Sequence, residues 1–148
     1  MRIALASALL AASIVSLAAP KASAQERGLA RVDSGLARLK RALGPTYFEE
    51  QQQMTRQFYS DPSPKTERWQ PTRGSYVILA AGDQNVAGIV LRLIGPDSAI
   101  VAADTSGSTT ARINLTAPVH GTRYRLMYAP TNCSPFPCYV GLQIMKRR

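Results

Sequence analysis

The part of the chain from Ser75 onward alternates between short apolar runs and turn residues, and this pattern constrains the fold most. Six runs are rich in β-branched residues or alternate apolar with polar side chains, which is typical of strands. They cover residues 76–80, 89–94, 99–102, 111–116, 123–128 and 140–145. Turn residues such as Gly82-Asp83 separate them. Because no helical segment lies between the runs, the pattern predicts an antiparallel β-sandwich or barrel rather than a parallel α/β sheet.

The first 24 residues have the plan of a secretory signal peptide. The positive start Met1-Arg2 precedes an apolar run over residues 3–19, and Ala22-Ser23-Ala24 is a small-residue cleavage signature. We expect cleavage after Ala24, which places the mature protein in the periplasm or outside a bacterial cell. The alternative is a retained transmembrane anchor. No later segment approaches the roughly 20 apolar residues that span a bilayer.

Residues 26–43 form an amphipathic helical pattern that Gly44-Pro45 ends. Its apolar residues recur at spacings of three and four and form one stripe: Leu29, Val32, Leu36, Leu39 and Leu43. Three interpretations stay open: the stripe packs on the rest of the protein, it lies on a membrane surface or a partner, or the segment is a frayed leader.

The segment between this helix and the strands has little pattern. Phe48, Met54 and Phe58 suggest a second short helix, so we expect a helical extension over residues 25–60. Asp61-Pro62-Ser63-Pro64 is a clear break. We expect residues 61–74 to be a linker with Trp69 as its one anchor, and residues 75–148 to form the sandwich domain.

Two cysteines and one histidine exclude a Cys/His zinc module, an iron–sulfur protein and a disulfide-dense miniprotein. Cys133 and Cys138 enclose Ser-Pro-Phe-Pro. A redox pair would need Cys-x-x-Cys spacing at a helix start, and a metal site would need two further ligands where only His120 remains among Cys and His. Since export supplies an oxidising compartment, we predict a disulfide that fixes the turn between the last two strands.

Several segments of the strand region occur in an order and spacing typical of one family. They are Tyr76-Val77-Ile78 followed by Ala81-Gly82-Asp83, and then residues 90–93, 101–105, 121–126 and 138–142. In these segments the region 75–145, about half of the chain, resembles the bacterial pre-peptidase C-terminal (PPC-like) β-sandwich domains. The resemblance implies an exported, non-catalytic, jelly-roll-like sandwich associated with secretion, stabilisation, or binding of polymers and proteins. The helix over residues 26–43 lies outside it.

Some PPC-like domains bind calcium through acidic loops, and calcium takes six to eight oxygen ligands. The available donors are Asp83, Asn85, Asp97 and Asp104, which are spread over three loops. Relatives often carry further Asp where Gln84-Asn85 follow Asp83 here, and Asp and Asn are also ordinary turn residues. We therefore expect no cofactor, with calcium as a weak alternative.

Catalytic patterns are absent from the sequence. His120 is the only base for a serine hydrolase, no Gly-x-Ser-x-Gly elbow occurs, and Glu49-Glu50 lie in a polar segment without a predicted cleft. No phosphate-binding glycine loop or dinucleotide fingerprint is present. We therefore expect that the protein is not an enzyme.

The excess of positive charge is the one affirmative functional signal. Lys and Arg number 18 against 9 Asp and Glu, a net charge of +9. Arg92, Arg112, Arg123 and Arg125 alternate with apolar neighbours, so they should point away from the core and share a face if their strands are adjacent. Such a face suits an envelope protein, a glycan or an anionic lipid surface. A solvated charged face is the alternative, and export and the lack of a motif argue against nucleic acid.

These observations predict a non-catalytic, periplasmic or secreted binding module. The alternative is a structural or assembly component that docks a partner through the stripe of the helix over residues 26–43.

Overall fold

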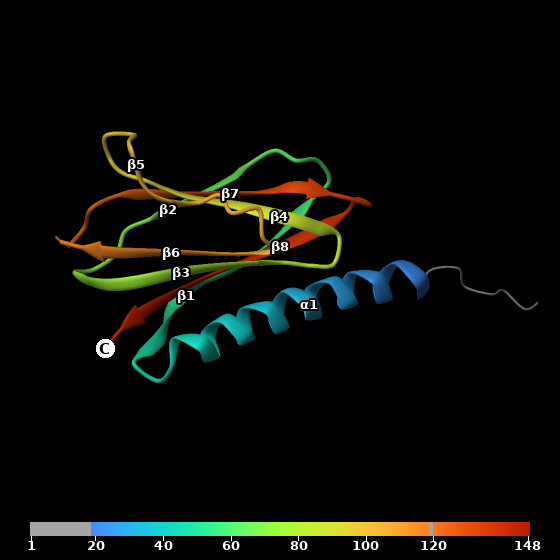
Figure 1. The fold of residues 1–148 in the computed structure, drawn as a ribbon, viewed down its shortest axis with the longest axis horizontal. Helices are drawn as coiled ribbons and strands as arrows, with labels where there is room; N and C mark the ends of the chain where they lie inside the picture. Colours follow the sequence, from blue (N-terminus) through green and yellow to red (C-terminus); the bar gives the residue numbers. More distant parts are fainter. Residues whose placement is uncertain (1–18, 119) are drawn as a thin grey trace, which may run out of the picture.

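A computed structural model describes residues 19–118 and 120–148, with the side chains of residues 19–23 and 51–58 left out of the description. In this part of the chain one helix precedes eight strands that form two four-stranded antiparallel sheets (Figure 1). The elements are α1 (Ala19–Leu43), β1 (Tyr47–Tyr59), β2 (Lys65–Trp69), β3 (Gly74–Gly82), β4 (Val86–Ile94), β5 (Ile100–Asp104), β6 (Thr110–Ala117), β7 (Tyr124–Cys133) and β8 (Cys138–Arg147). The predicted antiparallel sandwich is confirmed.

The strand order is that of a jelly roll. The first sheet has the order β1-β8-β3-β6 and the second sheet has the order β2-β7-β4-β5. The pairs β1–β8, β2–β7, β3–β6 and β4–β5 are therefore nested, as in one long hairpin rolled into two layers. The jelly-roll-like form that the family resemblance implied is what the described strands adopt.

The main core lies between the two sheets. On β6 and β7, buried and exposed residues alternate, because every second side chain points into the sandwich. Tyr128, Ile78 and Ile144 are fully buried there. At one end of this core, the Trp69 ring packs edge-on against the Tyr76 ring, with 5.1 Å between the ring centroids.

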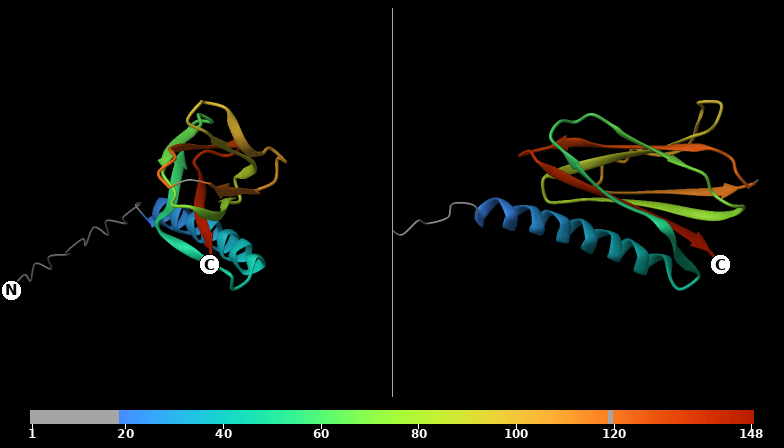
Figure 2. Two further views of the ribbon diagram at one scale, coloured as in Figure 1. Left: turned by 90° about the vertical axis from the view of Figure 1, so that its left-hand side faces the viewer. Right: turned by 180° about the vertical axis from the view of Figure 1, so that it is seen from behind.

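The helix covers the outer face of β3 and β8 in the first sheet, so these two strands are buried on both sides (Figures 1 and 2). Val32 and Leu36 of α1 are buried against Leu79 of β3 and Met145 of β8. The other three stripe residues, Leu29, Leu39 and Leu43, are half-buried in the same cluster. The stripe therefore packs on the protein itself, and the interpretation of it as a partner-docking surface is wrong.

The end of α1 is fixed by local signals. Gly44 follows the last helical residue with φ +78°, a conformation that glycine adopts without steric cost. An ion pair between Lys40 and Glu49 joins the last turns of the helix to β1. Within the described residues, no helix is both long enough and apolar enough to cross a membrane.

Two strands replace the predicted helix and linker. Residues 47–59 form β1 and not a second helix, and residues 65–69 form β2 within the expected linker. The sandwich thus begins at Tyr47 rather than at Ser75. Both segments are edge strands whose single neighbours are distant in sequence, β8 for β1 and β7 for β2, so pairing rather than local pattern decides their structure. Trp69, the expected anchor of the linker, is a core residue of β2.

Candidate functional site

A groove of about 1070 Å³ runs along one flank of α1, between the helix and the end of the first sheet where β3 stops and β6 starts. We call it the α1 groove. Its helical wall carries four arginines, and its sheet wall consists of the β3–β4 turn and the first residues of β6. The lining residues are Ala24, Arg27, Ala30, Arg31, Ser34, Gly35, Arg38, Arg41, Gly82, Asp83, Gln84, Thr109 and Thr110.

Helix periodicity places the four arginines together. Arg27, Arg31, Arg38 and Arg41 are spaced by four, seven and three residues, so they lie along one face of the helix, away from the apolar stripe that fixes the helix to the sheet. All four side chains are exposed. Among the residues whose side chains the structure describes, no acidic side chain pairs with Arg31, Arg38 or Arg41. The groove therefore has positive charge available to a ligand.

Backbone hydrogen bonds make the sheet wall of the groove rigid. The Gly82 N–H donates to the Thr109 carbonyl at 2.9 Å, and the Asp83 N–H donates to the Tyr139 carbonyl at 3.0 Å. The turn is closed by Asn85, whose N–H donates to Asp83 Oδ1 at 3.1 Å. These bonds join the ends of β3, β6 and β8 at the sheet wall of the groove.

Asp83 is an unusual member of this wall, because it is only 3% exposed. Its Oδ2 atom is buried and accepts no hydrogen bond from the described residues. Burial raises the pKa of Asp83, although hydrogen bonds from the N–H groups of Asn85, Tyr139 and Val86 oppose the rise. The helix passes directly over this carboxyl, since a Cβ atom at Gly28 would lie 3.1 Å from Asp83 Oδ2. Only a residue without a side chain lets α1 approach so closely.

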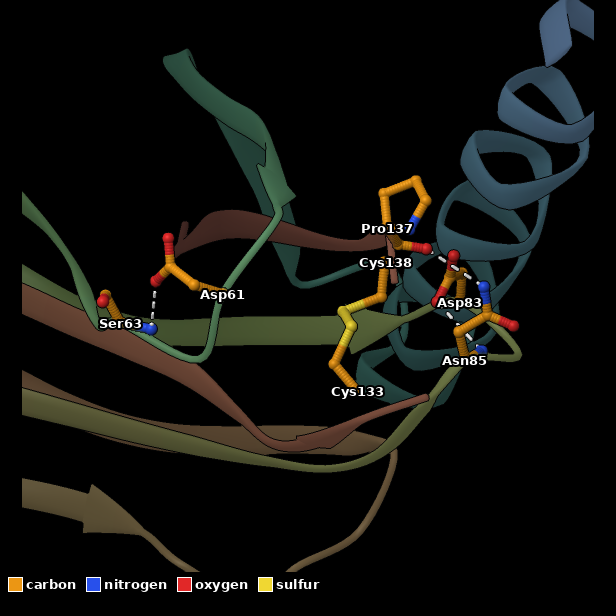
Figure 3. The surroundings of a disulfide bond; sticks show 7 residues. All are labelled: Asp61, Ser63, Asp83, Asn85, Cys133, Pro137 and Cys138. Carbon is orange, nitrogen blue, oxygen red and sulfur yellow. Dashed lines mark hydrogen bonds between the residues drawn. A yellow bond between two sulfur atoms is a disulfide. The ribbon is translucent and has the colours of Figure 1, made fainter. Parts of the chain in front are cut away.

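The predicted disulfide closes the neighbouring loop between β7 and β8 (Figure 3). Cys133 and Cys138 are bonded, so the prediction from their spacing is confirmed. Asn85 connects this loop to the turn of the groove, since its Nδ2 donates to the Pro137 carbonyl at 3.1 Å and its own carbonyl accepts from the Ser134 N–H at 2.9 Å. The disulfide thus supports the end of the sandwich where the groove lies.

The four arginines predicted to share a face are divided between the two sheets. Arg92 on β4 and Arg125 on β7 point outward from the second sheet, and Arg123 is exposed just before β7. Arg112 instead lies opposite Leu79 on the outer face of the first sheet, the face that α1 covers. The expected convergence is therefore wrong for Arg112, because β6 pairs with β3 rather than with β4 or β7. Arg112 lies on the same face of β6 as Thr110, which lines the α1 groove, but it is not part of the lining.

The calcium candidates act as turn residues. Asp97 Oδ1 accepts the Ala99 N–H, and Asp104 accepts the N–H groups of Ser106 and Arg112. Burial alone would raise the pKa of Asp104, but these hydrogen bonds together lower it. Asp83 and Asn85 lie in the β3–β4 turn, Asp97 in the β4–β5 turn, and Asp104 at the end of β5. Within the described ranges, no three His, Cys, Asp or Glu side chains gather as a metal site requires. His120 is exposed in the turn before β7.

The sequence analysis missed the arginines that line the groove, and it missed Arg68. The spacing of the helical arginines shows that they lie outside the apolar stripe. They line a groove only because α1 packs on β3 and β8. Arg68 lies opposite Arg125 on the second sheet and was hidden within the expected linker.

Comparisons with known proteins place the chain in no family. No protein-family model matches the chain, and no curated protein matches it in sequence. The resemblance to PPC-like domains therefore stays a prediction. Among solved structures, the chain is similar to Aeromonas hydrophila PliG, a periplasmic lysozyme inhibitor of g-type lysozyme. The TM-score is 0.41 with 11% sequence identity, over 69% of this chain and 89% of that chain.

Proposed function

We propose that this protein is an exported, non-catalytic binding module that holds an anionic ligand in the α1 groove. The observation that supports it best is the row of four exposed arginines on one wall of that groove, three of them without an acidic partner among the described residues. Guanidinium groups are the preferred protein partners of carboxylates, phosphates and sulfates, because their planar donor set can bind two oxygens at once. Export is supported by the signal-peptide pattern of residues 1–24 and by the disulfide.

The main competing account is that the arginines bind no ligand and only keep the protein soluble. Arginines that only keep the protein soluble would be distributed without regard to cavities, whereas these four lie along one groove. Their long stems also leave stability nearly unchanged when the charge is removed, since exposed charged positions usually alter the free energy of unfolding by less than about 0.5 kcal/mol. Binding and stability can therefore be measured separately.

The test compares two triple variants that lose the same net charge. Arg31→Gln/Arg38→Gln/Arg41→Gln alters the groove, and Arg68→Gln/Arg123→Gln/Arg125→Gln alters the outer face of the second sheet. Binding of the mature protein to sulfate, heparin and phosphatidylglycerol vesicles is measured by calorimetry at two salt concentrations. We expect at least one probe to lose affinity only in the groove variant, and wild-type binding to weaken as salt rises. Equal affinity of both variants for every probe, or a loss confined to the second-sheet variant, overturns the proposal.

A further inference from the structure

We infer that the ligand of the α1 groove is a linear acidic polysaccharide that lies along the helix. This inference rests on the proposed function and names the chemical class that the groove fits. It is drawn from the length of the arginine row, from the chemistry of the opposite wall, and from what both walls lack.

The arginine row is too long for a small anion. Arg27 and Arg41 are 14 residues apart, which corresponds to about 21 Å along the helix axis. One phosphate or sulfate could contact only the guanidinium groups of neighbouring turns, so it would leave most of the row unused. An extended chain with an anionic group at regular intervals can contact all four arginines.

The remaining lining suits the hydroxyl groups of sugars. Gln84, Thr109 and Thr110 on the sheet wall provide amide and hydroxyl groups that both donate and accept hydrogen bonds. Ser34 on the helix donates to the Ala30 carbonyl, so its hydroxyl oxygen is available as an acceptor. These side chains line the same groove as the arginines, so one chain could place its acidic groups toward α1 and its hydroxyl groups toward β6. A purely electrostatic surface would not need this second, neutral polar wall.

The groove lacks the features that other anionic macromolecules require. Its apolar lining consists of Ala30, Gly35 and Gly82, together with Ala24, which the expected cleavage removes. It therefore offers no hydrophobic pocket for lipid acyl chains or for the apolar side chains that anchor peptides. It contains no aromatic residue, whereas single-stranded nucleic acids stack their bases on aromatic side chains. An acidic glycan depends on neither feature, and it is the class that the observations favour.

The experiment measures the affinity of the mature protein for a series of sulfated glycosaminoglycan oligosaccharides of increasing length. We expect the affinity to rise with length until the chain spans the arginine row, about 21 Å, and then to level off. The variant Arg31→Gln/Arg38→Gln/Arg41→Gln should lose at least about tenfold in affinity for the long oligosaccharides. The second-sheet variant with three Gln substitutions is the matched control and should bind as the wild type does.

A second pair of measurements tests the class of the ligand. Thr109→Val/Thr110→Val keeps the shape of the sheet wall and removes two hydroxyl groups, so it should weaken oligosaccharide binding several-fold and leave the binding of polyglutamate unchanged. Tighter binding of polyglutamate or of phosphatidylglycerol vesicles than of length-matched oligosaccharide overturns the inference and leaves the anion-binding function intact. Full affinity already at the disaccharide or with inorganic sulfate overturns it in the same way. If no anionic probe distinguishes the groove variant from its control, the proposed function itself fails.

Discussion

Asp83 combines a turn-forming oxygen with an oxygen that has no partner among the described residues. Its Oδ1 closes the β3–β4 turn, while Oδ2 is buried beneath Gly28 of α1. A carboxyl whose native pKa is raised binds its proton more tightly in the folded state. Its contribution to stability is therefore greatest at low pH and decreases as pH rises through the raised pKa.

The substitution Asp83→Asn tests this assignment. Asparagine keeps an oxygen for the Asn85 N–H and removes the charge, so the variant should gain stability over the wild type as pH rises from about 4, the ordinary aspartate value, to 7. Urea unfolding at a series of pH values measures the difference. A constant difference in the free energy of unfolding between the two proteins over that range would contradict a raised pKa.

Gly88 is a residue whose identity the backbone dictates. It lies at an irregularity of β4, where the register with β7 shifts on both sides of it. A Cβ atom at this position would collide with the carbonyl of Gly107 and would lie 2.6 Å from Thr131 Oγ1. Because a backbone carbonyl cannot move aside as a flexible side chain can, Gly88→Ala should destabilise the protein by about 1–3 kcal/mol. The control is Ala87→Ser at the exposed neighbouring position; similar melting temperatures for the two variants would refute the steric argument.

The helix α1 is held to the first sheet by its apolar stripe. Leu36 is 2% exposed and packs in the cluster that contains Leu79 and Tyr139. Truncation of a buried leucine removes transfer free energy and leaves a cavity, so Leu36→Ala should cost about 2–5 kcal/mol. Denaturant unfolding measures this cost, with the exposed substitution Arg41→Gln as the control. An unchanged midpoint for Leu36→Ala would mean that α1 does not contribute to the folded domain.

The disulfide loop is the second element with a measurable contribution. Its ring is small, and in the loop-entropy model a closed loop of this size stabilises by about 2 kcal/mol. The variant Cys133→Ala/Cys138→Ala should therefore melt at a lower temperature than the wild type. Thiol labelling of the native, unreduced protein should detect no free thiol. Labelling of both cysteines would contradict the bond.

The sequence predicts the elements that carry their own pattern and misses those that depend on a partner. All six strands expected after Ser75 are present, since alternation or a continuous apolar run marks each of them. The unbroken apolar run of β3 has a physical reason: its outer face is covered by α1 and its inner face by the second sheet. By contrast, β1 contains three consecutive glutamines, which favour no face, and its pairing with β8 is a contact between the two ends of the domain.

The sequence predicts less of the candidate site than of the fold. The spacing of Arg27, Arg31, Arg38 and Arg41 already places them off the stripe, but the opposite wall comes from residues 82–84 and 109–110, which no helical pattern can bring near. For the strand arginines, the sequence predicts which way the side chains point but not the sheet to which each belongs. Alternation correctly points Arg92 and Arg112 outward, yet it cannot tell that they belong to different sheets that face in opposite directions.

On the scale of the whole molecule, the packing of α1 on the first sheet places part of the positive charge in one groove. Expected cleavage after Ala24 removes Arg2 and Lys21, so 16 of the 18 basic residues remain against 9 acidic ones. Four of them form the wall of the one groove described above, at the end of the sandwich that the disulfide loop and the Asp83 turn hold in place. Because backbone hydrogen bonds fix the sheet wall of the groove, a ligand that binds there should order few side chains besides the arginines themselves.

The most direct test of this account is a nuclear magnetic resonance titration of the mature protein with a heparin oligosaccharide. If the ligand lies in the α1 groove, the amide signals of Gln84, Thr109 and Thr110 and the guanidinium signals of the α1 arginines should shift together and saturate at one equivalent. Shifts that concentrate on Arg68, Arg92 and Arg125, with the groove signals unchanged, would place the ligand on the outer face of the second sheet and contradict the central claim.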